Sequence, residues 1–202
     1  PQFLQSAVAS ALSQTLAPLE VIVVDDGAGA AETLRGLSDI VTVLDNHQHG
    51  PVPARILGVT RCNADCIAFL DDDDWWTDHN YLETSAALFE DGADFCFGDG
   101  TLVFDDGRPD LAFAFDADVA SLERDNTILI SAVSYRRSLH ASLGRFDPAL
   151  PFYWDWDWYL RVARSGARLA HLAEPVVAIR VHGQNMSGET LEVPVSALKR
   201  TN

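Results

Sequence analysis

A six-residue run near the start of the chain places the strongest limit on what this sequence folds into. The run is Leu-Glu-Val-Ile-Val-Val at residues 19–24, and it ends on Asp25, Asp26 and Gly27. Short runs that are mostly apolar and β-branched are typical of strands covered on both faces, as in a parallel sheet. The run therefore predicts a buried strand whose carboxyl end carries two acidic side chains.

Helices and strands alternate along the first hundred residues. Helical spacing of apolar residues is found at 2–15, 30–38, 53–62 and 79–90, and strand-like apolar runs are found at 40–44, 66–70 and 93–97. This alternation predicts an α/β fold with a Rossmann-like, doubly wound and mostly parallel sheet. Ligands bind such sheets beyond the carboxyl ends of the strands.

After Gly100 the pattern changes to a smaller and less regular region. It predicts a hairpin from 101–104 and 111–115, helices near 136–142 and 155–165, and a strand at 176–181. We expect one domain over residues 1–183, divided into halves 1–100 and 101–183. Residues 184–202 are polar, and we expect them to form a C-terminal tail.

The composition excludes several classes of protein. The chain has 202 residues, 48% of them hydrophobic, so it can bury a core without disulfides or a structural metal. Its 30 acidic and 14 basic residues give a formal charge of −16, which argues against nucleic-acid partners and a basic membrane-docking face. The three cysteines lack zinc-ligand spacing, and no stretch of about 20 apolar residues predicts a membrane segment. We expect a reduced, cytoplasmic protein.

Four consecutive aspartates, Asp71 to Asp74, directly follow the predicted strand at 66–70. Their mutual repulsion favours a bound cation, and Mg²⁺ and Mn²⁺ prefer such oxygen ligands while keeping positions open for substrate phosphates. A solvated charged turn is the alternative, because blocks of like charge usually face water. The position at a strand end, before Trp75 and Trp76, favours the metal site.

Asp25 and Asp26 occupy the corresponding place after the first strand. Carboxylates there accept hydrogen bonds from a nucleotide base or a ribose, although an ordinary turn and helix N-cap would use the same residues. Among basic residues, Arg55 begins a predicted helix and is a candidate for a bidentate phosphate contact or a surface position. Near the end, Arg180 and His182 share one strand face, and His182 is either a ligand or a structural histidine.

Residues 152–161 alternate aspartates with large aromatic side chains. Asp157 precedes Arg161 by four positions, which favours an ion pair on a helix and a structural role. Asp155 has aromatic residues at the same spacing, so we expect it to face a partly apolar cleft in which its pKa is raised. Such a carboxylate is a useful general base. The alternative is that Asp155 caps the helix.

Taken together and in order, these segments resemble the family two glycosyltransferases of the GT-A fold. The resemblance runs from about residue 3 to 187 and rests on residues 11–15, 20–27, 54–58, 69–76, 144–147, 155–161 and 180–187. It implies an inverting, metal-dependent enzyme of the hexosyltransferase type. Such an enzyme moves a sugar from a nucleotide-sugar donor, UDP-linked by default, to a carbohydrate, lipid-linked or small-molecule acceptor.

The resemblance also assigns roles to residues. Asp26 contacts the nucleotide base, Asp71 the ribose, and Asp73 the Mn²⁺ or Mg²⁺ ion. Asp155 is the catalytic base, and His182 contacts the metal or the diphosphate. Further contacts to the nucleotide-sugar are expected from Asp25, Arg55 and Asp72, and contacts to the sugar or the acceptor from Trp75, Trp76, Trp154 and Trp156.

Three departures from the family pattern matter. Trp154 stands where the family usually has a glutamate before the base, and Ala28 and Ala30 stand where it often has serine and aspartate. The second departure predicts a different donor affinity or nucleotide choice. The family's first, buried strand would lie before Pro1, so we expect that the sequence begins late or that the chain is incomplete, because loss of a central strand would expose an uncovered sheet edge.

Two other functions use the same residue types. A phosphohydrolase or nucleotidyltransferase also places aspartates at strand ends, and would release phosphate or pyrophosphate. A non-catalytic carbohydrate-binding module would stack sugars on the tryptophans around a structural cation and would need no nucleotide. Glycosyl transfer instead releases a nucleoside diphosphate.

Overall fold

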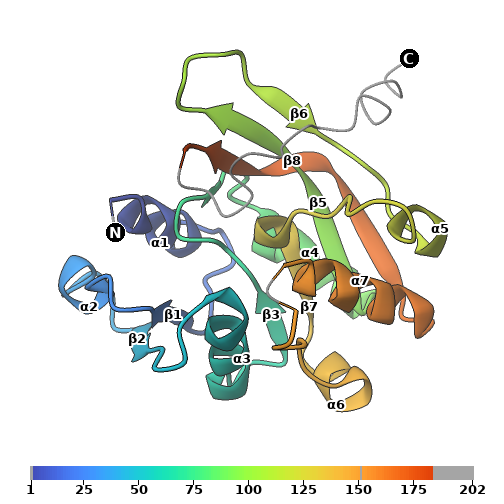
Figure 1. Ribbon diagram of the computed structural model, residues 1–202, viewed down its shortest axis with the longest axis horizontal. Helices are drawn as coiled ribbons and strands as arrows, with labels where there is room; N and C mark the ends of the chain where they lie inside the picture. Colours follow the sequence, from blue (N-terminus) through green and yellow to red (C-terminus); the bar gives the residue numbers. More distant parts are fainter. Residues whose placement is uncertain (1, 151, 184–202) are drawn as a thin grey trace.

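The computed structural model describes residues 2–150 and 152–183 of the chain (Figure 1). Its helices are α1 (Leu4–Leu12), α2 (Ala30–Thr33), α3 (Pro51–Arg61), α4 (Tyr81–Glu90), α5 (Val119–Leu122), α6 (Leu139–Leu143), α7 (Trp154–Arg164) and the short 3₁₀ helix η1 (Ile130–Ala132). Its strands are β1 (Val21–Asp25), β2 (Val41–Asp45), β3 (Cys66–Ala68), β4 (Trp75–Trp76), β5 (Phe95–Phe104), β6 (Leu111–Phe113), β7 (Val133–Arg136) and β8 (Leu169–Val181). The expected tail, 184–202, lies outside the described residues. No helix among the described residues has the length and apolar character needed to cross a bilayer.

The strands form two groups. β1 and β2 pair in parallel, while β3, β7, β5, β8 and β4 lie in that order in a second sheet, with β6 added to β5. Within the second sheet only β5 and β8 are parallel, and the other pairs are antiparallel. The α/β class is confirmed, but the sheet is mixed rather than mostly parallel. A short hairpin explains only the antiparallel β5–β6 pair, because the other antiparallel pairs join segments that lie far apart in the chain and whose direction the local pattern does not determine.

Most predicted elements are present, with two differences in length. The predicted strand at 93–97 continues to Phe104, so β5 forms both the sheet centre and one arm of the predicted hairpin with β6. β8 is one strand of 13 residues whose pairing with β5 shifts register near Asp99. The sequence pattern does not predict β7, which has only four residues and lies between β3 and β5. Its position is set by pairing on both sides rather than by its own pattern.

The facing edges of β1 and β3 have no strand partner among the described residues. β1 pairs with β2, and β3 pairs with β7, while both strands line one groove. α1 also lines this groove with Leu4, Ala7 and Val8, so the wall between the two strands is largely apolar.

α7 is fixed to the core along one face. Trp154, Trp158, Tyr159 and Val162 recur at helical spacing and are buried. On the other side, Arg161 donates from Nε to Asp157 Oδ2 over 2.8 Å, which confirms the expected ion pair. The same guanidinium also donates to the Leu143 and Arg145 carbonyls. The helix that carries Asp155 is therefore held at several points.

We predict that Gly100→Ala destabilises the fold. A Cβ atom at Gly100 would lie 2.5 Å from Leu129 Cδ1 and 2.9 Å from Val177 Cγ1, where β5 pairs with β8. Overpacking of this kind costs about 1–3 kcal/mol of unfolding free energy. Gly183→Ala is the matched control, because no atom of the described residues lies within 4 Å of a Cβ added there. Urea unfolding of both variants tests this, and equal midpoints would contradict it.

Candidate functional site

One groove of about 1650 Å³ collects most of the residues singled out in the sequence. It is bounded by the carboxyl ends of β1 and β3, the start of α3, residues 126–130 and the start of α7. From the predicted set it contains Asp25, Asp26, Arg55, Asp71, Asp72, Asp73, Trp76, Trp154 and Asp155. Trp75, Trp156 and His182 are not among its lining residues. Residues from both halves of the chain therefore face one cavity.

The acidic run does not act as four equivalent carboxylates. Asp71, Asp73 and Asp74 each place an oxygen within 4.8 Å of the others, whereas Asp72 is exposed. Asp74 is buried, and its two oxygens accept hydrogen bonds from Ser131 Oγ (2.6 Å) and the Arg180 backbone N–H (3.0 Å). Burial, followed by repulsion from Asp71, raises the pKa of Asp74 to about 7. Asp74 thus links the acidic run to η1 and β8, and it is the least available of the three carboxylates to a ligand.

Asp73 is better placed to meet a cation. Its carboxylate lies 3.0 Å from His182 Nε2. Burial and then the neighbouring charge of Asp71 raise the pKa of Asp73, while the hydrogen bond with His182 opposes this effect. Hard carboxylate oxygens that repel one another at this spacing fit a divalent cation such as Mg²⁺ or Mn²⁺. His182 supports Asp73 in this arrangement.

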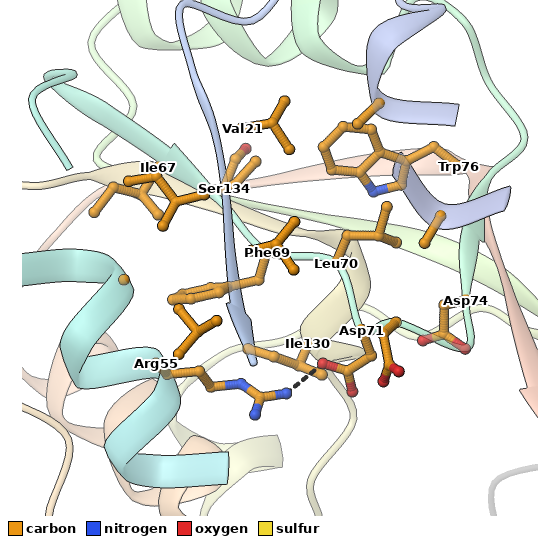
Figure 2. A pocket seen from close by; sticks show the side chains of 18 of the residues that line it. Val21, Arg55, Ile67, Phe69, Leu70, Asp71, Asp74, Trp76, Ile130 and Ser134 are labelled. Carbon is orange, nitrogen blue, oxygen red and sulfur yellow. Dashed lines mark hydrogen bonds and ion pairs between the residues drawn. The ribbon is translucent and has the colours of Figure 1, made fainter. Parts of the chain in front are cut away.

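Arg55 links the acidic run to α7. Its guanidinium makes an ion pair with Asp71, and Figure 2 shows the side chain reaching from α3 toward that carboxylate below the apolar wall of the groove. The same group lies 4.5 Å from the ring centroid of Trp154, and the side chain is only 15% exposed. A cation held between a carboxylate and an indole stays positioned at the groove floor.

Asp25 and Asp26 differ in what they bind. Asp25 accepts hydrogen bonds from the backbone N–H groups of four residues, 27 to 30. Burial acts to raise the pKa of Asp25, but these donors outweigh burial and lower it. Asp26 instead accepts from Asn46 Nδ2 and from the Gly50 backbone N–H (2.7 Å), and so holds the loop before α3. Asp25 thus shapes the turn at the rim of the groove, whereas Asp26 ties its two neighbouring loops together.

Asp155 lies in the first turn of α7 and is partly buried. The residue at the N-cap is Tyr153, so the capping alternative for Asp155 is wrong. Asn126 Nδ2 donates to Asp155 Oδ2 over 3.0 Å. Burial raises the pKa of Asp155, while the hydrogen bond from Asn126 opposes this effect. The expectation of a raised proton affinity in a partly apolar cleft is confirmed in direction.

Sequence reasoning missed Asn126 and Ser131. Each donates a hydrogen bond to an aspartate carboxylate that is distant in the chain, 29 positions away for Asn126 and 57 for Ser131. An isolated asparagine or serine carries no periodic signal, so only the folded structure brings these pairs together.

The predicted tryptophans offer little free ring surface. Trp76 and Trp154 are each 7% exposed, and Trp156 Nε1 donates to the Leu122 carbonyl. The aromatic residues that do expose their rings at the groove are Phe152 (58%) and Tyr153 (69%). The sequence pattern drew attention to the larger indoles, whereas the fold uses them in packing.

Comparison with known proteins identifies relatives of this chain. The model of the family described as "Glycosyl transferase family 2" matches residues 1–130. The uncharacterized glycosyltransferase YwdF of Bacillus subtilis is 32% identical over 187 residues, which cover 87% of this chain and 69% of YwdF. The succinoglycan biosynthesis protein ExoW of Rhizobium meliloti is 33% identical over 136 residues, 63% of this chain and 40% of ExoW.

Solved structures share the fold. Staphylococcus aureus TarS (residues 1–349), in a complex with UDP-GlcNAc, superposes with a TM-score of 0.72 at 17% identity over 90% of this chain. The match covers 55% of the TarS chain, so the present sequence spans little more than half of that structure. The expected α/β fold of the GT-A type is confirmed.

We predict that Ser131→Ala weakens the fold at the acidic run. The Ser131 hydroxyl donates to Asp74 and accepts from the Asp71 backbone N–H (3.0 Å), so its loss leaves a buried carboxylate short of a donor. The expected loss is about 1–3 kcal/mol of unfolding free energy. Ser142→Ala, which removes only a hydroxyl bonded within α6, is the control, with a change within about 0.5 kcal/mol. Similar denaturation curves for the two variants would contradict the role of Ser131.

Proposed function

The chain belongs to glycosyl transferase family 2, and on this premise we propose that it transfers a sugar from a UDP-sugar to an acceptor hydroxyl with inversion at the anomeric carbon. One observation carries the proposal. The triad of Asp71, Asp73 and Asp74 and the partly buried Asp155 line the same groove, with Arg55 between them. The residues proposed to bind the donor diphosphate and the residue proposed to accept the proton thus line one cavity.

The donor end rests on the acidic run and its neighbours. A Mn²⁺ or Mg²⁺ ion would be held by Asp73 with Asp71, and would neutralise charge on the diphosphate of the donor. Arg55 would add a second positive charge beside the same group. The TarS complexes with UDP and UDP-GlcNAc support a UDP-linked donor, because that protein shares the fold.

The acceptor end rests on Asp155. The acceptor oxygen attacks the anomeric carbon from the face opposite the diphosphate, its proton passes to Asp155, and the bond to the diphosphate oxygen breaks. One displacement of this kind inverts the configuration. A carboxylate whose pKa is raised by burial holds the proton better than an exposed one and is the stronger base.

We expect purified protein to release UDP from a UDP-sugar when Mn²⁺ or Mg²⁺ is added, and EDTA to abolish the release. A panel of nucleotide-sugars, with products separated by chromatography, tests this. Release of phosphate or pyrophosphate would indicate a phosphohydrolase or nucleotidyltransferase instead. Sugar binding without turnover of any donor would indicate a carbohydrate-binding module.

Within the same assay, Asp155→Asn should lower kcat for transfer by about a hundred- to ten-thousand-fold and leave donor affinity unchanged. Asp157→Asn is the matched control, because Asp157 lies two residues away and pairs with Arg161. That variant should keep its rate. Near-normal transfer by Asp155→Asn, with donor binding intact, would overturn the role of Asp155 as base.

We predict that Asn126→Ala moves the acid limb of the pH–rate profile to higher pH. Transfer requires ionised Asp155, so activity falls as the pH drops through its pKa. Burial raises the pKa of Asp155 and the Asn126 hydrogen bond lowers it, so removal of the donor raises the pKa further. Transfer rates across the acid range measure the effect, and plateau activity should fall far less than in Asp155→Asn. An acid limb that stays in place or moves down would contradict this role for Asn126.

A further inference from the structure

Tyr153 occupies a backbone conformation that side chains rarely adopt. It is one of two non-glycine residues with positive φ among those described, with φ 60° and ψ 16°, in the left-handed region. A tyrosine there is strained, whereas glycine or asparagine fits with little strain. Strain of this kind persists where the surroundings enforce it, and it gathers at functional sites.

Packing does not account for a tyrosine at this position. The residue is 69% exposed, and its ring makes an edge-on contact with Trp156, with centroids 5.9 Å apart. Its backbone carbonyl accepts the first hydrogen bond of α7 from the Asp157 N–H, which any residue type provides. The side chain therefore adds little to the stability of the helix start.

Tyr153 lines the same groove as the proposed catalytic base, Asp155. Tyr153 and its exposed neighbour Phe152 line the groove together with Asp155, and Phe113 from β6 lines it as well. Tyr153 and Phe152 are thus exposed two and three residues before the carboxylate that accepts the acceptor proton in the proposed function. A large, rigid ring gives contact area with little loss of conformational freedom.

The charges at this end of the groove indicate the kind of molecule that binds. Beside the aromatic rings the groove presents Asn126 and the carboxylate of Asp155, while the nearby cation, Arg55, is already paired with Asp71 and stacked on Trp154. In a chain of net charge −16, this arrangement disfavours a phosphate on the part of the acceptor that lies here. An uncharged ring with a flat C–H face and free hydroxyls satisfies both the aromatic surface and the polar groups.

We propose that Tyr153, with Phe152, forms a stacking platform for an uncharged pyranose ring of the acceptor, whose hydroxyl faces Asp155. The assignment rests on the proposed function and names its acceptor class as a carbohydrate. The strained backbone at Tyr153 is retained because it aims the ring at the groove.

The test uses the full chain with a UDP-sugar that it turns over. The acceptor probes are the methyl glycosides of glucose, galactose and N-acetylglucosamine, and the comparators are glucose 6-phosphate and farnesyl phosphate. We expect UDP release above background hydrolysis with at least one methyl glycoside. Transfer to the phosphorylated probes alone, or to no methyl glycoside, would overturn the assignment.

Three variants separate stacking from structure. Tyr153→Ala and Tyr153→Gly should raise the KM for the methyl glycoside by about tenfold or more, in line with the loss of one stacked ring, and leave donor KM unchanged. Tyr153→Phe keeps the ring and should keep the KM. Tyr153→Gly also relieves the left-handed strain, so its Tm should be no lower than that of the unsubstituted protein, which excludes misfolding as the cause.

The two proposals fail in different ways. If the unsubstituted chain releases no UDP from any donor, the proposed function fails. If it transfers sugar but Tyr153→Gly and Tyr153→Ala keep the acceptor KM, only the platform fails. A Tyr153→Phe variant as impaired as Tyr153→Ala would assign the effect to the hydroxyl and overturn stacking.

Discussion

Compensation of negative charge at the end of β3 constrains the structure more than any other interaction. Consecutive carboxylates at the rim of a buried strand repel one another, and three of the four use different partners from distant parts of the chain. Arg55 of α3 pairs with Asp71, His182 lies beside Asp73, and Ser131 donates to Asp74. These contacts join α3, the η1 segment and the end of β8 around one point. The acidic run thus organises the elements around it as well as offering ligand atoms.

This arrangement explains why the residues in the run have different roles. Each carboxylate oxygen of Asp74 accepts a hydrogen bond, one from a hydroxyl and one from a backbone N–H, so Asp74 has a structural role. The pKa of Asp73 is raised as well, and Asp73 is less buried than Asp74, so positive charge from a ligand can reach its carboxylate more readily. A divalent cation in the proposed enzyme would supply that charge together with the donor, so donor binding and charge compensation would be coupled.

The residues of α7 likewise divide into those that fix the helix in place and those that face the groove. Its indoles pack into the core or against Arg55, and the Asp157–Arg161 pair fixes its outer face. These contacts leave Asp155 at the groove, held by Asn126, and leave Tyr153 exposed at the helix start. A rigid helix with a strained first residue suits a site in which a base and a binding surface must keep a fixed relation. The departure from the family at Trp154 fits this picture, because that ring carries the Arg55 guanidinium.

The sequence by itself determined the α/β class, the positions of most helices and strands, and the acidic strand ends. These features depend on local patterns, namely apolar periodicity and residues that follow directly after a strand. It also identified Asp155 as different from Asp157, because helical spacing pairs one with Arg161 and leaves the other beside aromatic residues. The mixed directions of the sheet, the place of β7 and the contacts of Asn126 and Ser131 came only from the tertiary structure. Each of these depends on pairing between segments that are distant in the chain. The burial of Trp76 and Trp154 depends on which face of their element packs against the core, and the packing of the whole fold determines that face.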